Sequence, residues 1–236
     1  MTTVKLTMPK NEIQQLIKES YERTTKKSSY HKYSSIEVFI NDPLPDNIEL
    51  NSVFSFINER IPSYMLDLID VVYIGQAPEL EDRSINAMYS NGAIYLTNAQ
   101  DNEQDMIDDI VHEIAHALED SYGQEIYATG EIKEEFLSKR RILERVLLYM
   151  DYDTDSYDFD RVEYNMKFDF FLHQEIGYSI IEPITAGTFV TSYAATSLRE
   201  YFATGFEDYY LNSGRDIKAI SPSVYAAIDK LNDMRY

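Results

Sequence analysis

Residues 104–118 read Gln-Asp-Met-Ile-Asp-Asp-Ile-Val-His-Glu-Ile-Ala-His-Ala-Leu, and the fold prediction starts from this stretch. Its apolar residues fall on one side of a helix and form a stripe: Ile107, Ile110, Val111, Ile114 and Leu118. This period is typical of an amphipathic helix whose apolar face packs on a core. We therefore predict a helix from Gln104 that ends near Tyr122-Gly123, because glycine is favoured just past a helix end.

The histidines of this stretch have the spacing of a metal site. His112 and His116 lie one turn apart, so their imidazoles share a helix face and can bind one zinc ion. Glu113 points beside the metal, where it can accept a proton from a zinc-bound water. The alternative is a chance His-Glu-x-x-His on a solvated helix, but half of the chain's 4 histidines belong to this motif. We predict one Zn²⁺ per chain.

Such a zinc site needs a third protein ligand and an open fourth position. The chain has no cysteine, so the ligand must come from histidine or a carboxylate. A metzincin would continue with Gly and His, but Glu119 and Tyr122 occupy those places and exclude that class. No further histidine lies nearby, so a downstream carboxylate is expected. The candidates include Glu131, Glu134, Glu135, Glu175, Glu200 and Glu207.

A second segment resembles a known family. Tyr193-Ala-Ala-Thr-Ser-Leu-Arg-Glu200, together with the His112–His116 motif, is similar to the anthrax lethal factor family of peptidases, which includes the Pro-Pro endopeptidases. The resemblance covers the chain from about Ile74 to its C-terminus. It implies a zincin-like fold and endopeptidase activity. It also implies that Glu200 binds zinc and that the Tyr193 hydroxyl supports the oxyanion.

Helix geometry is compatible with these roles but leaves alternatives. If both residues were helical, Tyr193 and Glu200 would share a face about 10 Å apart along the axis. If Tyr193 instead precedes the helix, a bend could bring it closer. Ser197-x-x-Glu200 also fits a capping box, in which the carboxylate turns back to the helix start. Tyr193 could equally be an ordinary packing residue among the chain's 20 tyrosines.

The rest of the chain predicts an α+β fold in one domain, 1–236, and the resemblance implies that this fold is zincin-like. A small N-terminal mixed sheet with helices (1–105) precedes a helical lobe (106–236), and the active-site helix lies between them. We predict strands at Ile36–Ile40, Asp70–Ile74 and Ala93–Thr97. We predict further helices at Asn11–Ser20, Val53–Glu59, Glu134–Tyr149, Arg161–Tyr178, Leu198–Leu211 and Pro222–Met234. Loops are expected at Glu22–Ser35, Gln76–Ser90 and Asp151–Asp160.

Charge and composition limit the kinds of partner that we expect for this chain. A formal net charge of -20 repels nucleic acid and anionic membranes, so we expect neither as a partner. Met1–Lys10 lacks the apolar stretch of a signal peptide, and no window has the length of a membrane span. The expected location is cytoplasmic, with secretion by another route left open.

Weaker features have simpler interpretations. Glu207 could support a histidine ligand, although a solvated glutamate is the simpler expectation. His173 is expected on a helix surface or in packing, and His31 in an exposed loop. The acidic residues from Asp151 to Asp155 lack the glycine and glutamate of a calcium loop.

The leading functional prediction is a zinc metalloendopeptidase. We expect His112, His116 and Glu200 to bind the metal and Glu113 and Tyr193 to be catalytic, with the roles of Glu200 and Tyr193 implied by the resemblance. A protein or peptide substrate would lie extended along Ala93–Thr97, unless the apolar Ile94 and Leu96 make that strand an interior one. The alternatives are a non-cleaving zinc-binding or structural protein that keeps the fold, and a zinc hydrolase of a non-peptide amide.

Overall fold

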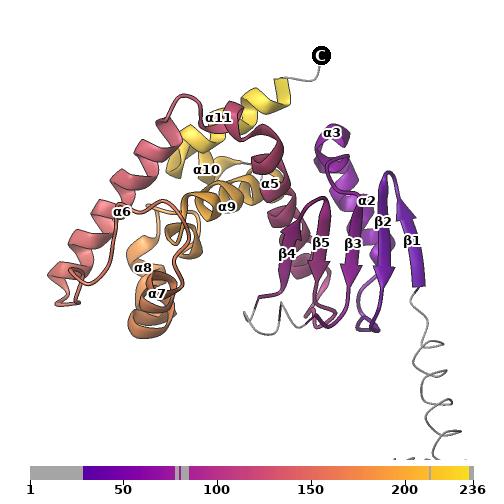
Figure 1. Ribbon diagram of the computed structural model, residues 1–236, viewed down its shortest axis with the longest axis horizontal. Helices are drawn as coiled ribbons and strands as arrows, with labels where there is room; N and C mark the ends of the chain where they lie inside the picture. Colours follow the sequence, from indigo (N-terminus) through magenta and orange to yellow (C-terminus); the bar gives the residue numbers. More distant parts are fainter. Residues whose placement is uncertain (1–28, 78–79, 81–84, 213, 234–236) are drawn as a thin grey trace, which may run out of the picture.

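The computed structural model describes residues 29–77, 80, 85–212 and 214–233 and has an α+β fold with a five-stranded mixed sheet (Figure 1). The strands are β1 (Ser29–Tyr33), β2 (Ile36–Ile40), β3 (Val71–Ile74), β4 (Ala87–Ser90) and β5 (Ala93–Leu96). Their order across the sheet is β1-β2-β3-β5-β4. The inner strands β2, β3 and β5 are parallel, and β1 and β4 are antiparallel edge strands.

The three inner strands are confirmed, whereas both edge strands lie where loops were predicted. β1 falls in the predicted loop Glu22–Ser35, and β4 falls in the predicted connection Gln76–Ser90. Neither edge strand has a fully buried residue, so neither shows the alternation that marks a strand in sequence. The predicted helix Asn11–Ser20 and residues 22–28 of the predicted loop lie outside the described residues.

The position of β5 overturns one expectation. β5 pairs with β3 on one side and with β4 on the other, so it is not a free edge and no peptide can extend the sheet there. Ile94 and Leu96 are fully buried, as expected of an interior strand. The outer strand on this side is β4.

The two faces of the sheet are packed differently. One face packs on α2 (Leu50–Arg60) and α5 (Glu103–Tyr127), and α3 (Ser63–Leu66), which lies beyond the strand ends, shares the same apolar core (Figure 1). The other face carries an aromatic row of Tyr30, Phe39, Tyr73 and Tyr95, which are paired in register. Successive ring centroids lie 5.3, 5.6 and 5.4 Å apart.

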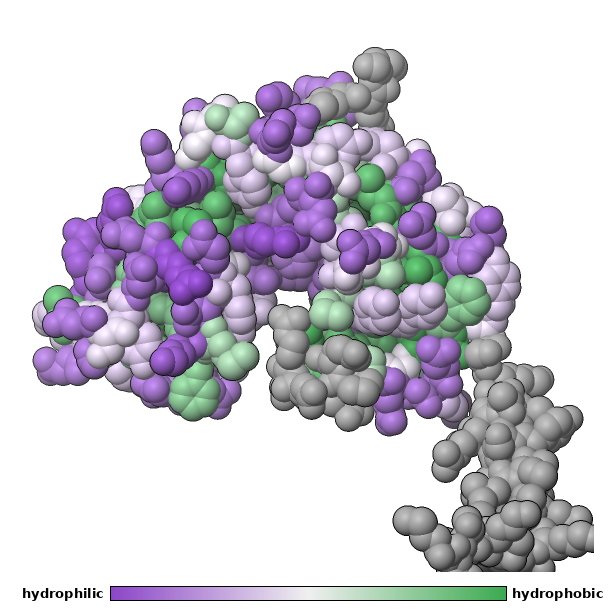
Figure 2. Space-filling model, in the orientation of Figure 1, coloured by the Kyte–Doolittle hydropathy of each residue, from purple (hydrophilic) through white to green (hydrophobic). Residues whose placement is uncertain are grey.

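The aromatic row reaches the edge strand. Met88 of β4 pairs in register with Tyr95, and Figure 2 shows pale and green side chains side by side over this part of the sheet. Cross-strand side-chain pairs of this kind stabilise a sheet and oppose slippage. The row therefore helps to fix the register of β4, the strand nearest to the site described below.

The helical half follows α5. It contains α6 (Glu131–Tyr149), α7 (Met166–Phe170), the π-helix η1 (Phe171–Gly177), α8 (Tyr178–Thr185), the 3-10 turn η2 (Tyr193–Ala195), α9 (Leu198–Leu211), α10 (Arg215–Ile220) and α11 (Pro222–Asp233). The helix predicted at Leu198–Leu211 is confirmed at both ends. The helix predicted to end near Tyr122 instead bends there, where Tyr122 has non-helical φ/ψ of -123° and 21°, and continues to Tyr127. The helix predicted at Arg161–Tyr178 starts only at Met166 and changes to a π-helix.

Helix α9 lies in the core of this half and packs against α5. Gly205 allows the close approach of α10 and α11, because a Cβ there would lie 2.8 Å from side-chain atoms of Ile217 and Val224. That 1–236 is a single domain stays a prediction. None of the described helices combines the length and the apolar character that a membrane span requires.

Candidate metal site and its cleft

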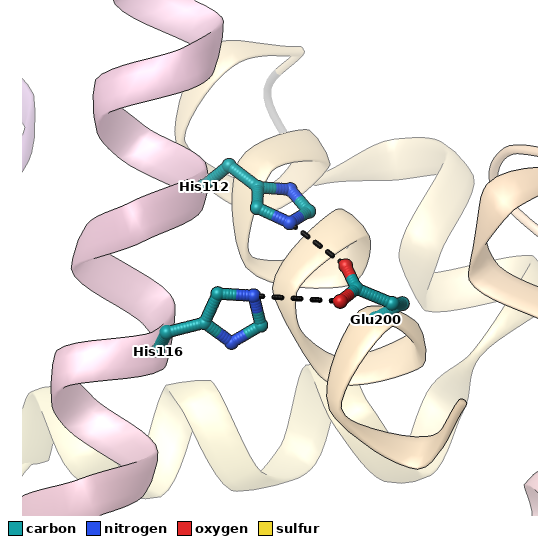
Figure 3. Close-up of side chains that lie close together, drawn as sticks. All are labelled: His112, His116 and Glu200. Carbon is teal, nitrogen blue, oxygen red and sulfur yellow. Dashed lines mark hydrogen bonds and ion pairs between the residues drawn. The ribbon is translucent and has the colours of Figure 1, made fainter. Parts of the chain in front are cut away.

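Helix α5 presents the two histidines of the motif. Its apolar stripe is buried, and the Asn102 side chain caps its start by accepting from the backbone N–H groups of Gln104 and Asp105. The opposite face carries His112 and His116, whose ring centroids lie 5.0 Å apart (Figure 3). Their side chains are 17% and 13% exposed, so a small ion can reach them.

Helix α9 brings Glu200 to these histidines. Ser197 caps α9 by accepting from the Glu200 backbone N–H at 3.2 Å, which is half of the expected capping box. The carboxylate does not turn back to complete the box. It lies between the imidazoles instead, 2.9 Å from His112 Nε2 and 3.7 Å from His116 Nε2 (Figure 3).

These three residues could hold a metal ion. One ligand atom from each lies within 4.8 Å of the others, and among the described residues no second group of this kind occurs. Ligand atoms around a tetrahedral zinc lie about 3.4 Å apart, given metal–ligand bonds of about 2.0–2.2 Å. The observed separations bracket that value, so the geometry fits a small transition-metal ion.

The charges of the group agree with cation binding. Burial lowers the pKa of His116, but hydrogen bonds to the carboxylates of Glu119 and Glu200 outweigh it and raise this pKa to about 9. Burial likewise raises the pKa of Glu200, yet the two imidazoles hold it well below its usual value. Glu200 is therefore an ionised carboxylate that attracts positive charge. A metal ion can supply that charge in place of the protons on the imidazoles.

Two more carboxylates hold the outer nitrogens of the imidazoles. Glu119 Oε2 lies 2.8 Å from His116 Nδ1, and Glu207 Oε2 lies 3.3 Å from His112 Nδ1. Partners of this kind orient histidine ligands so that Nε2 faces the metal. Glu207 is thus not the solvated residue that we expected. Tyr127 donates to Glu119, as does Arg199 Nε at 3.2 Å.

Sequence reasoning missed Glu119 and Tyr127 as parts of the site. The signal for Glu119 was its place three residues after His116, on the same helix face. Tyr127 lies beyond the bend in α5 and carries no such signal.

Glu113 lies beside the three candidate ligands. It is 6% exposed, and its Oε2 accepts the backbone N–H of Tyr89 in β4 at 2.6 Å. Burial raises the pKa of Glu113, although both histidines oppose the shift. A carboxylate with a raised pKa that faces a cleft suits a group that accepts and returns a proton.

A cleft of about 680 Å³ opens over this group. β4 and α5 line one side, the segment around Tyr164 lines another, and Tyr193 and Glu200 also reach it. Tyr193 lies in η2, before α9, so the shared helix face with Glu200 is not formed and the bent alternative holds. Asp109 also lines the cleft, and burial raises its pKa to about 6 although Gln100 donates to it.

The other predicted candidates lie elsewhere. Glu134 is exposed on α6, and Glu135 accepts from the hydroxyls of Tyr201 and Ser223. Glu175 accepts from the Tyr157 hydroxyl at 3.2 Å. Glu131 contacts Thr129 at the start of α6. None of them belongs to the candidate metal group.

The remaining histidines are outside the metal group as well. His31 is exposed, as expected, although it lies in β1 rather than in a loop. His173 is a buried packing residue rather than a surface one. Comparison of the chain with family models, curated proteins and solved structures gave no match.

Proposed function

We propose that this chain is a zinc-dependent metalloendopeptidase with a zincin-like fold, in which His112, His116 and Glu200 hold Zn²⁺. One observation carries the proposal: Glu113, a buried carboxylate outside the ligand group, faces the same cleft as the three ligands. Two imidazoles and one carboxylate form a three-ligand donor set of the kind that hydrolytic zinc sites use. The resemblance to the lethal factor family supports the same assignment.

In the proposed mechanism the metal ion and the side chains of the protein have separate roles. Zn²⁺ held by His112, His116 and Glu200 would supply Lewis acidity for the activation of water and of a substrate carbonyl. Glu113 accepts the proton of the attacking water and returns it to the leaving amine. Tyr89 holds one Glu113 oxygen through its backbone N–H, which leaves the other for the proton. The Tyr193 hydroxyl donates to the carbonyl oxygen as negative charge develops on it.

Metal analysis tests the proposal at its base. We expect about one zinc per chain in protein purified without added metal, and loss of that zinc in the His112→Ala/His116→Ala double variant. A chelator should abolish peptide cleavage, and zinc should restore it. The same donor set also suits Fe(II), which elemental analysis distinguishes from zinc. Unchanged zinc in the double variant would refute the site.

The outcome of a cleavage screen decides between the functional alternatives. Chelator-sensitive cleavage of peptides supports the endopeptidase. Hydrolysis of non-peptide amides alone indicates the second class of hydrolase. A stoichiometric zinc without any turnover indicates a binding protein that keeps the fold.

The edge strand β4 is where we expect the peptide to bind. Thr97 donates its backbone N–H to Asn86 O, so in this register Ala87 and Tyr89 direct their backbone groups away from β5. The Tyr89 N–H is already bonded to Glu113. The backbone N–H and C=O of Ala87 are therefore the next outward-facing groups along the same edge. An extended peptide that pairs there would run along the cleft beside the candidate metal group.

Ala87→Pro tests this binding mode. Proline removes the outward N–H but leaves the pairing with β5 intact, because edge strands accept proline where the N–H faces away from the sheet. We expect KM to rise about fivefold or more, which is the loss of about one hydrogen bond. Zinc content and melting temperature should stay close to wild type. An unchanged KM in a folded variant would place the peptide elsewhere.

A further inference from the structure

The helical half contains a buried histidine that the proposed chemistry does not use. His173 lies in the π-helix η1 and is 6% exposed. π-helical turns are rare and often occur at functional sites. The imidazole contacts the rings of Tyr178 and Tyr193, with centroids 4.9 and 6.0 Å away. His173 therefore packs on the tyrosine that lines the cleft.

Asp169 holds this imidazole in place. Its Oδ1 accepts from His173 Nδ1 at 2.7 Å, and its Oδ2 accepts from the Tyr164 hydroxyl at 2.7 Å. Burial raises the pKa of Asp169, but these two hydrogen bonds outweigh burial and keep the pKa below its usual value. Asp169 is therefore an ionised carboxylate with both oxygens engaged, and one of its two donors, Tyr164, also lines the cleft.

Packing alone does not explain a histidine at position 173. Only one of the two ring nitrogens, Nδ1, is engaged by Asp169. Nε2 is buried, and no described residue hydrogen-bonds to it. A buried polar atom without a hydrogen bond is destabilising, and a phenylalanine filling the same space would avoid that cost. The histidine gains from Asp169 a fixed ring orientation that phenylalanine would lack.

We infer that Asp169 and His173 are positioning residues that fix the orientation of the Tyr193 ring in the cleft. The inference rests on the proposed function, in which the Tyr193 hydroxyl donates to the substrate carbonyl. The backbone of Tyr193 is held separately, because Thr196 Oγ1 donates to its carbonyl oxygen at 2.8 Å. The His173 ring lies against the Tyr193 ring and limits its rotation about the side-chain bonds. A donor to a transition state must be placed to within about 0.5 Å, so this limit affects the rate.

The first arm of the test needs neither metal nor substrate. In chelator-treated protein, the ring signals of Tyr193 are assigned by NMR from their loss in Tyr193→Phe. We expect Asp169→Ala to shift or broaden them, because His173 loses its anchor. Asp169→Asn keeps an oxygen that can accept from Nδ1–H, so its Tyr193 signals should stay near wild type. Unchanged signals in a folded Asp169→Ala variant would overturn the inference.

The second arm is kinetic. We expect Asp169→Ala to lower kcat about tenfold, as losses of supporting contacts do, with KM and zinc content unchanged. Tyr193→Phe should lower kcat about 10²-fold. The double variant should be no slower than Tyr193→Phe alone, because both changes remove the same donor. Multiplied effects in the double variant would overturn the inference.

The two proposals can fail separately. If Glu113→Gln keeps full turnover, the proposed peptidase mechanism is wrong, and the NMR arm still reports whether Asp169 orients Tyr193. If Glu113→Gln is inactive while the Asp169 and Tyr193 effects multiply, the mechanism stands and the positioning role is wrong.

Discussion

Glu113→Gln is expected to remove turnover and leave the zinc and the fold in place. The substitution keeps the size of a buried side chain, and its amide oxygen can still accept the Tyr89 backbone N–H. It removes the carboxylate that the proposed mechanism uses to transfer a proton from water to the leaving amine. Loss of a general base slows a reaction about 10²–10⁴-fold, so kcat should fall at least about 10²-fold.

The measurement is kcat/KM on a cleavable peptide, with zinc content and melting temperature determined on the same preparation. Glu125→Gln is the matched control, since Glu125 is exposed on the same helix. We expect the control to retain wild-type rates. Full activity of Glu113→Gln would show that another group takes the proton and would remove the assigned base.

Glu200→Ala is expected to have the second large effect, on metal affinity. Glu200 contacts both imidazoles and is the only carboxylate of the candidate metal group. Loss of an outer partner weakens metal binding about 10–100-fold, so loss of a direct ligand should weaken it by at least about 10²-fold. Activity should fall with zinc occupancy, and excess zinc should restore little of it because the remaining site is incomplete.

Glu134→Ala, Glu135→Ala and Glu175→Ala are the comparison variants, and zinc affinity is measured by competition with a chromogenic chelator. Glu134→Ala should leave the zinc affinity unchanged, because Glu134 is exposed. Glu135 contacts Tyr201 and Ser223, so its loss should lower the melting temperature but not the zinc affinity. Wild-type affinity in Glu200→Ala, with loss in one of the others, would overturn the ligand assignment and the support for Tyr193.

The elements that were predictable are those whose signals are local. The α9 helix begins behind the Ser197 cap and keeps its apolar period to Leu211, and both features can be read in sequence. The spacing of His112 and His116 likewise sets their common face. Joining them to Glu200 needed the family resemblance, because 88 residues separate His112 from Glu200 and no periodicity spans that distance.

The features that were missed depend on tertiary contacts. In sequence, Glu119 resembles an ordinary helix-surface glutamate. In the structure it is buried and accepts from Tyr127 and Arg199. The edge strand β4 is defined by its pairing with β5 and by the Glu113 bond rather than by its own alternation. The π-helix around His173 departs from the helical period, so a pattern search extends an α-helix through it.

The long separation of the candidate ligands also has a consequence during synthesis on the ribosome. His112 and His116 are translated well before Glu200, so a nascent chain offers a metal ion the two imidazoles without the carboxylate of the candidate group. The complete candidate group forms only after α9 is complete and has docked on α5. The proposed peptidase would therefore acquire its metal late, and newly made chains would stay inactive without any inhibitor until their C-terminal helices had folded.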